Sequence, residues 1–171
     1  MDTSFRQQIK KLIELYENKR YQETEKFALY LIEKFPRQPF PYKMLGIVFK
    51  QSGKLKEALI SMQKSIQLAP QDFECHNNIG ITLRELGRLQ EAEESFRQVI
   101  KLKPNHIFAH NHLGITLQAL GKLDEAEESC KQAIKLKPDF LDAHNNLGNI
   151  FLKLDKLIEA EKSYRQVIKL K

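Results

Sequence analysis

The stretch QDFECHNNIGITLRELGRLQEAEESFRQVIKLKP, residues 71–104, returns as NHIFAHNHLGITLQALGKLDEAEESCKQAIKLKP, residues 105–138, with 20 of 34 positions identical and no gap. Residues 139–171 continue the same pattern, and residues 37–70 precede it more loosely. Residues 1–36 hold a degenerate copy that lacks the glycines. A fixed period of 34 residues along the whole chain predicts a single domain built from repeated structural units.

Each repeat carries two sets of apolar residues with helical spacing. In residues 71–104 the first set is Ile79, Leu83 and Leu86, and the second is Leu89, Ala92, Phe96, Val99 and Ile100. Gly87 stands between the sets, where a left-handed residue would end the first helix, and Pro104 stands where the second helix must stop. The pattern therefore predicts an all-α chain in which every repeat is a hairpin of two helices.

All seven glycines occupy two repeat positions. The turn position holds Gly53, Gly87 and Gly121, and the first helix holds Gly46, Gly80, Gly114 and Gly148. A glycine inside a helix costs about 1 kcal/mol relative to Ala, so its recurrence indicates close helix packing. We expect the pairs Gly80 and Ala92, Gly46 and Ala58, Gly114 and Ala126, and Gly148 and Ala160 to face each other. In the last repeat Asp155 replaces the turn glycine, which Asp tolerates because it enters the left-handed region more readily than most residues.

The composition describes an ordered chain without a membrane helix. There are 28 Lys and Arg against 22 Asp and Glu, a formal net charge of +6, and no apolar run longer than Met44 to Phe49. A membrane helix needs roughly 20 apolar residues, and the N-terminus lacks the apolar core of a secretory signal. We therefore expect a cytoplasmic protein. Cys75 and Cys130 are expected to be buried hydrophobes, with no disulfide and no metal site.

The recurring histidines do not predict a chemical site. His76, His110 and His144 share one repeat position, and stacked helices lie about 8–10 Å apart, too far for three imidazoles to bind one zinc ion at about 2 Å each. Cys75 and His76 cannot form a nucleophile and base pair, because neighbours in a helix do not face each other. We expect packing residues, and no catalysis, metal or cofactor.

The lysine excess has a local explanation. Lysines close three of the second helices: Lys101, Lys103, Lys135, Lys137, Lys169 and Lys171. Glutamates begin two of the same helices, so the charges complement the helix dipole at about 0.3 to 1 kcal/mol each. Because these six lysines equal the net charge of +6, single-stranded RNA binding is less favoured than binding of a protein.

Counted from Phe73 as place one, the repeat resembles the tetratricopeptide repeat. Glycine recurs at place eight, alanine at place twenty and proline at place thirty-two, and place twenty-four holds Met62, Phe96 and Tyr164, from which Cys130 departs. The resemblance implies a right-handed superhelical solenoid of antiparallel helix pairs. It also implies that the first helices line a concave groove that binds peptides or partner proteins.

The family's groove places predict the binding residues of this chain. They are Lys43, Ile47, Asn77, Asn78, Ile81, Arg84, Asn111, His112, Ile115, Asn145, Asn146 and Asn149. Asparagine amides beside an isoleucine stripe suit the main chain and apolar side chains of a segment of modest charge. The alternative is that some of these residues complete packing and hydrogen bonds between repeats.

The chain lacks the binding residues of one family subtype and resembles a second subtype. The carboxylate clamp that holds chaperone C-termini is not assembled, because Ile47, Phe108 and His112 occupy three of its five places. Openings such as HNNLG are similar to the arrays of O-GlcNAc transferases and related bacterial glycosyltransferases. The first interpretation is therefore a protein-binding scaffold, and the second is a substrate-recruiting segment of a larger glycosyltransferase- or sulfotransferase-like enzyme.

The last repeat predicts an uncovered end. No polar capping helix follows Lys171, and solenoids normally cover their terminal apolar face. We expect Ala160, Tyr164 and Val167 to leave an apolar end surface. The chain would then be a fragment of a longer array or would self-associate through this end.

Overall fold

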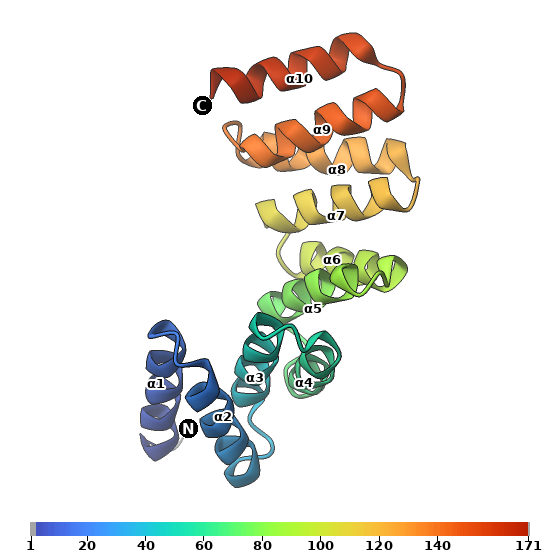
Figure 1. Ribbon diagram of the computed structural model, residues 1–171. Helices are drawn as coiled ribbons and strands as arrows, with labels where there is room; N and C mark the ends of the chain where they lie inside the picture. The colour runs from blue at the N-terminus through green and yellow to red at the C-terminus, as the bar shows by residue number, and fades with distance from the viewer. Residues whose placement is uncertain (1–2, 171) are drawn as a thin grey trace. The chain divides into compact units, whose positions relative to one another are not determined.

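The computed structural model describes residues 3–170, which form ten helices and no strand (Figure 1). The helices are α1 (Thr3–Glu17), α2 (Tyr21–Lys34), α3 (Pro39–Gln51), α4 (Leu55–Leu68), α5 (Phe73–Glu85), α6 (Leu89–Leu102), α7 (Ile107–Ala119), α8 (Leu123–Leu136), α9 (Leu141–Lys153) and α10 (Leu157–Lys169). The all-α prediction is confirmed. Met1, Asp2 and Lys171 lie outside the described residues. Lys171 is the last of the six lysines predicted to close the second helices, so the prediction for it lies outside the described residues as well.

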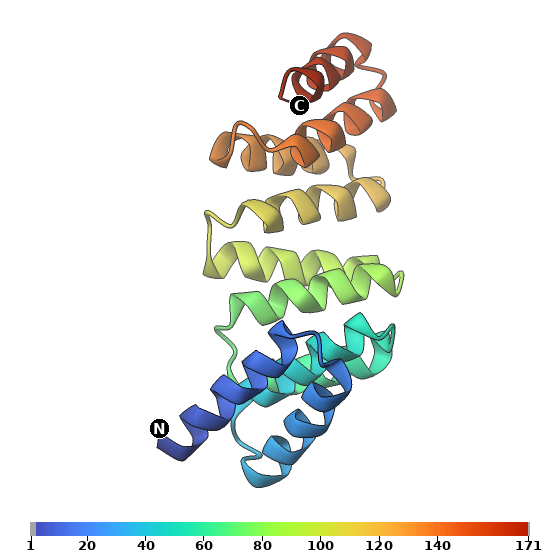
Figure 2. The same ribbon diagram turned by 60° about the vertical axis from the view of Figure 1, so that its left-hand side comes forward.

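The chain divides into two compact units. Unit 1 spans residues 1–86 and contains α1 to α5, and unit 2 spans residues 87–171 and contains α6 to α10. In unit 1, α3 packs against both α2 and α4. In unit 2, α7 lies between α6 and α8 (Figure 2), and α9 packs against both α8 and α10. Each unit is thus a layered stack of antiparallel helix pairs.

The turn between the two helices of a pair needs a left-handed residue, as predicted. Gly53, Gly87 and Gly121 have φ angles of 72°, 75° and 77°. Asp155 takes the same conformation at φ 58°, which confirms the expectation for the last repeat. Lys19, at φ 57°, fills this place in the degenerate first repeat, so the missing glycine does not abolish the turn.

The helical glycines let two helices approach closely. A Cβ added at Gly114 would lie 2.5 Å from Cys130 Sγ and 3.3 Å from the Ala126 carbonyl oxygen. At Gly46 it would lie 2.5 Å from Met62 Cγ and 3.0 Å from the Ala58 carbonyl oxygen. The predicted pairings with Ala126 and Ala58 are confirmed, although the residue at place twenty-four is closer still.

The remaining two predicted pairs are Gly148 with Ala160 and Gly80 with Ala92. The nearest atoms to an added Cβ at Gly148 belong to the Tyr164 ring, the closest at 2.7 Å, and not to Ala160. The ring at place twenty-four is therefore the nearest neighbour of Gly148, and the pairing of Gly148 with Ala160 stays a prediction. The pairing of Gly80 with Ala92 stays a prediction.

The recurring histidines tie each first helix to the loop before it. Nε2 of His76, His110 and His144 lies 3.0, 2.8 and 2.9 Å from the carbonyl oxygen of Pro70, Pro104 and Pro138. Tyr42 occupies the same place and donates its hydroxyl to the Pro36 carbonyl at 3.2 Å. The four prolines themselves are exposed, so these bonds act as surface ties that fix the loop between repeats against the helix that follows it.

Of the three residues predicted to form an end surface on α10, Tyr164 and Val167 are half-buried and partly accessible, whereas Ala160 is buried. Ala160 is only 1% exposed, because place twenty faces the first helix of its own hairpin, as Ala58 and Ala126 do. Its inclusion in that surface was wrong. Leu157, Ile158 and Ile168 are the large apolar residues that α10 exposes, at 62%, 66% and 74%.

Ion pairs link successive second helices of unit 2. Glu93 on α6 accepts hydrogen bonds from Lys122 Nζ at 2.8 Å and from Arg97 Nε at 3.0 Å. One repeat later, Glu127 on α8 accepts from Lys156 and Lys131. Burial alone raises the pKa of both carboxyls, but the hydrogen bonds to the cations outweigh it and hold each pKa below its usual value.

These lowered pKa values predict acid sensitivity. A carboxyl whose pKa is lower in the folded state contributes stability above its unfolded pKa of about 4.3 and loses it as the pH falls through the folded pKa. We expect the Glu93→Gln, Glu127→Gln double variant to be less stable than the wild type at pH 7 and to lose less stability between pH 5 and pH 3. Urea unfolding across this range measures both effects.

The exposed Glu94 and Glu128 on the same two helices provide the control. Their replacement by Gln should leave the pH dependence unchanged. If the free energy of unfolding of the wild type and of the Glu93→Gln, Glu127→Gln variant falls equally between pH 5 and pH 3, these two carboxylates are not the source of the acid sensitivity.

Candidate functional site

The predicted binding residues of unit 2 lie on one side of α7 and α9, the first-helix face. Asn146 Nδ2 on α9 donates to Asn111 Oδ1 on α7 at 2.9 Å, and Asn111 is only 4% exposed. For Asn111 the alternative reading holds: its amide joins two helices. The bond fixes α7 beside α9 and sets the spacing of the side chains around it.

Exposed apolar side chains flank this amide pair. Phe108 on α7 is 55% exposed and Leu152 on α9 is 50% exposed. The Phe108 ring is held by an edge contact with Phe140, at 5.5 Å between centroids. Ile115, two turns after Phe108 on α7, is half-buried. Large apolar side chains exposed on the face of the first helices make this face a candidate for binding.

Polar groups lie among these apolar side chains. Asn145 and Asn149 on α9 are exposed. Asn149 Oδ1 accepts a hydrogen bond from the Tyr164 hydroxyl at 2.7 Å, which leaves its amide nitrogen to donate. The half-buried His112 ring lies against the Phe96 ring in a tilted arrangement, with 5.4 Å between the ring centroids. The face thus combines amide donors and acceptors with apolar contact area.

In unit 1 the predicted cation Lys43 is already paired. Its ammonium lies in α3 at 9% exposure and donates to Asp72 at 3.0 Å and to Glu74 at 2.7 Å. Burial lowers the pKa of Lys43, but the bonds to Glu74 and Asp72 outweigh it and raise that pKa above its usual value. Lys43 therefore holds α3 to the start of α5, where Asp72 also caps the helix through the Cys75 N–H.

The remaining predicted residues of unit 1 are half-buried: Ile47, Asn77, Asn78, Ile81 and Arg84. Ile47 packs against the core cluster of α1, α2 and α3. Asn77 Oδ1 is buried without a hydrogen-bond partner in the part of the chain that the structure describes. Burial lowers the pKa of the Arg84 guanidinium.

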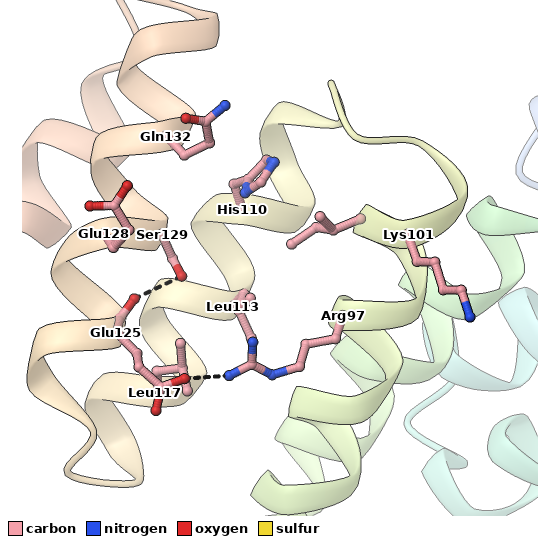
Figure 3. A pocket seen from close by; sticks show the side chains of 10 residues that line it. Arg97, Lys101, His110, Leu113, Leu117, Glu125, Glu128, Ser129 and Gln132 are labelled. Atoms are coloured by element: carbon pink, nitrogen blue, oxygen red, sulfur yellow. Dashed lines mark hydrogen bonds and ion pairs between the residues drawn. The ribbon is translucent and has the colours of Figure 1, made fainter.

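A recess of unit 2 lies on the opposite side of α7 (Figure 3). Its floor is His110, Leu113 and Leu117, and its walls come from α6 and α8. Successive helical residues differ by about 100°, so these floor residues point away from Asn111, His112 and Ile115. The recess encloses about 570 Å³. Sequence reasoning did not single it out, because its floor has the spacing of an ordinary core stripe.

The rim of this recess is electrically balanced. Arg97 on α6 reaches across to the Glu125 carboxylate on α8 at 2.5 Å (Figure 3). Arg97 also pairs with Glu93. Lys101 and Glu128 add one further charge of each sign to the lining. No net charge therefore selects a ligand for this second-helix side.

The cysteines offer no reactive group. Burial raises the pKa of the Cys75 thiol to about 11 and that of Cys130 to about 12, and a thiol reacts as its thiolate. Among residues 3–170 there is no cluster of three or more side chains able to hold a metal ion. The described helices include none that is long and apolar enough to cross a membrane.

A stack of short antiparallel helix pairs on a 34-residue period, with apolar and amide side chains exposed on its first helices, defines a helical-repeat protein. The tetratricopeptide repeat family matches residues 42–72, 73–106, 107–140 and 129–162. The chain belongs to the tetratricopeptide repeat family.

Solved structures share this fold. A MamA double mutant from strain RS-1 superposes with a TM-score of 0.92 at 19% identity, covering 99% of this chain and 96% of its own. YrrB, described as a TPR protein with an unusual peptide-binding site, gives 0.86 at 20% identity over 96% and 84%. PilF of Pseudomonas aeruginosa gives 0.84 at 17% over 96% and 75%. No curated protein is a significant match.

Proposed function

We propose that this protein is a protein–protein interaction scaffold that binds a peptide or protein segment on its first-helix face. The observation that carries the proposal is the exposure of Phe108 and Leu152 on α7 and α9, on either side of the amides of Asn145 and Asn149. The description of YrrB, a similar fold with a peptide-binding site, supports the same use of such a fold.

The chemistry of this face defines what it would bind. Fully burying a Phe or Leu side chain contributes about 1.5–3 kcal/mol, so each half-exposed residue has roughly 1 kcal/mol left to gain. Asparagine amides donate and accept, which suits main-chain N–H and C=O groups. The partner is therefore a segment with apolar side chains and an accessible main chain, extended or helical.

Peptide selection tests this proposal. Peptides selected on the wild-type protein from a random library should bind the Phe108→Ser, Leu152→Ser variant at least about tenfold more weakly, the equivalent of about 1.4 kcal/mol. Both residues are half-exposed, so the variant should keep its helicity. Fluorescence anisotropy measures the dissociation constants, and circular dichroism checks the fold.

The opposite side of α7 and α8 supplies a matched control. Glu128→Ser, Gln132→Ser places two serines in the wall of the second-helix recess and should leave affinity unchanged. If the control variant loses affinity and the Phe108, Leu152 variant keeps it, binding occurs on the second-helix side and the proposal is wrong.

A further inference from the structure

A separate recess opens in unit 1 between α1 and the start of α3. It encloses about 360 Å³ and is lined by Phe5, Arg6, Ile9, Lys10, Gln38, Pro39 and Phe40. Phe5 is buried at 3% exposure and rests its ring against Phe35 at 4.9 Å. Ile9 and Phe40 are half-buried and pack against the core of unit 1. The floor is therefore a rigid apolar surface that remains open on one side.

Two cations stand at the rim of this recess. Arg6 and Lys10 are both exposed and are four residues apart on α1, so they project from one side of the helix. Neither side chain forms an ion pair or a hydrogen bond with another residue of the described range 3–170. Lys43 and Lys50, the cations of the neighbouring helix α3, are instead neutralised by Asp72 and Glu74 and by Glu85.

We infer that this recess binds an apolar side chain of a partner peptide that carries carboxylates on either side of that residue. The inference rests on the proposed function, capture of peptide segments by the first helices, but uses a different set of residues. The apolar floor takes the anchoring side chain, and the unpaired charges of Arg6 and Lys10 attract the flanking acidic groups. The acidic character of the segment would set the orientation and the rate of binding.

Charge distinguishes this recess from the larger one in unit 2. The rim of the α6–α8 recess pairs Arg97 with Glu125 and so favours neither sign of ligand. At the α1–α3 recess, the charged residues in the lining are both positive. Of the two recesses, only the one between α1 and α3 has a charge that favours an acidic partner.

Three labelled peptides probe the site directly. The first is Gly-Asp-Glu-Phe-Glu-Asp-Gly, the second has Ser in place of Phe, and the third has Lys in place of each acidic residue. We expect the first to bind the full chain about tenfold more tightly than either analogue, with affinity that falls as salt is added. Fluorescence anisotropy at low and high salt gives the three constants.

Two charge-reversal variants locate the binding. Arg6→Glu, Lys10→Glu should weaken the first peptide at least about tenfold. Lys26→Glu, Lys56→Glu makes the same change of net charge at exposed positions of α2 and α4 and should leave its affinity within about twofold. Circular dichroism confirms that both variants stay helical.

Several outcomes overturn the inference. They are failure of the first peptide to bind the wild type, equal binding of the lysine peptide, and equal affinity for the wild type and the Arg6, Lys10 variant. Concentration-dependent dimers in light scattering that the Arg6, Lys10 variant abolishes would assign the recess to a second copy. Loss of binding only in the Phe108→Ser, Leu152→Ser variant would overturn this inference and leave the proposed function standing.

Discussion

Gly114→Leu is expected to lower the free energy of unfolding by about 3 kcal/mol, at the upper end of the cost of overpacking a close-packed interior. Even the first added carbon would lie 2.5 Å from Cys130 Sγ and 3.3 Å from the Ala126 carbonyl oxygen. Both atoms belong to α8, so α7 and α8 would have to separate. A loss of this size lowers the melting temperature by roughly 6–12 °C for a chain of this length, and thermal and urea unfolding followed by circular dichroism measure it.

Two further variants isolate the close approach as the cause. Ala119→Leu puts the same side chain at an exposed position of the same helix and should change stability by less than about 0.5 kcal/mol. The smaller Gly114→Ala clash should be partly relieved by Cys130→Ala, giving a favourable coupling energy in the double-mutant cycle. If Gly114→Leu and Ala119→Leu have equal effects, the glycine is not a packing residue.

Lys43→Met is expected to cost about 2 kcal/mol in unit 1. The Lys43 side chain is 11% exposed and its ammonium bonds both Asp72 and Glu74. Removing one member of a buried ion pair costs about 3–5 kcal/mol when the other charge stays buried. The cost is smaller here because Asp72 and Glu74 are 24% and 63% exposed and regain water.

Lys50→Met is the matched control, since Lys50 lies on the same helix. Its ammonium is 3.3 Å from Glu85, which is 42% exposed, and such pairs contribute about 0–1 kcal/mol. Urea unfolding should therefore rank Lys43→Met well below Lys50→Met in stability. Equal losses would show that the Lys43 network has no special structural role.

The fold could be predicted from the sequence because its signals are local and repeated. Gly53, Gly121 and Asp155 each mark a left-handed turn, and helix α6 ends at Leu102, two residues before Pro104. The turn at Lys19 could not be read in the same way, because lysine gives no local sign of a positive φ. The turn is closed by main-chain hydrogen bonds from Lys19 N–H to the Tyr16 carbonyl and from Arg20 N–H to the Leu15 carbonyl.

The candidate site could be predicted only in outline. Repeat places identify which side chains lie on the first-helix face, and Asn145, Asn149 and Ile115 are there. They do not say which side chains are already engaged. Asn111 is bonded to Asn146, and Lys43 is bonded to two acids. Both contacts join residues at least 29 apart in the sequence, so they depend on how the repeats stack and not on any local pattern.

The central claim is that peptide segments bind the first-helix face of α7 and α9. Chemical-shift mapping of the labelled protein with a peptide selected on the wild type tests it most directly. We expect the largest changes at Phe108, Asn145, Asn149 and Leu152, and we expect them to disappear in the Phe108→Ser, Leu152→Ser variant. Largest changes at Leu113, Leu117 and Gln132, which line the recess on the other side, would contradict it.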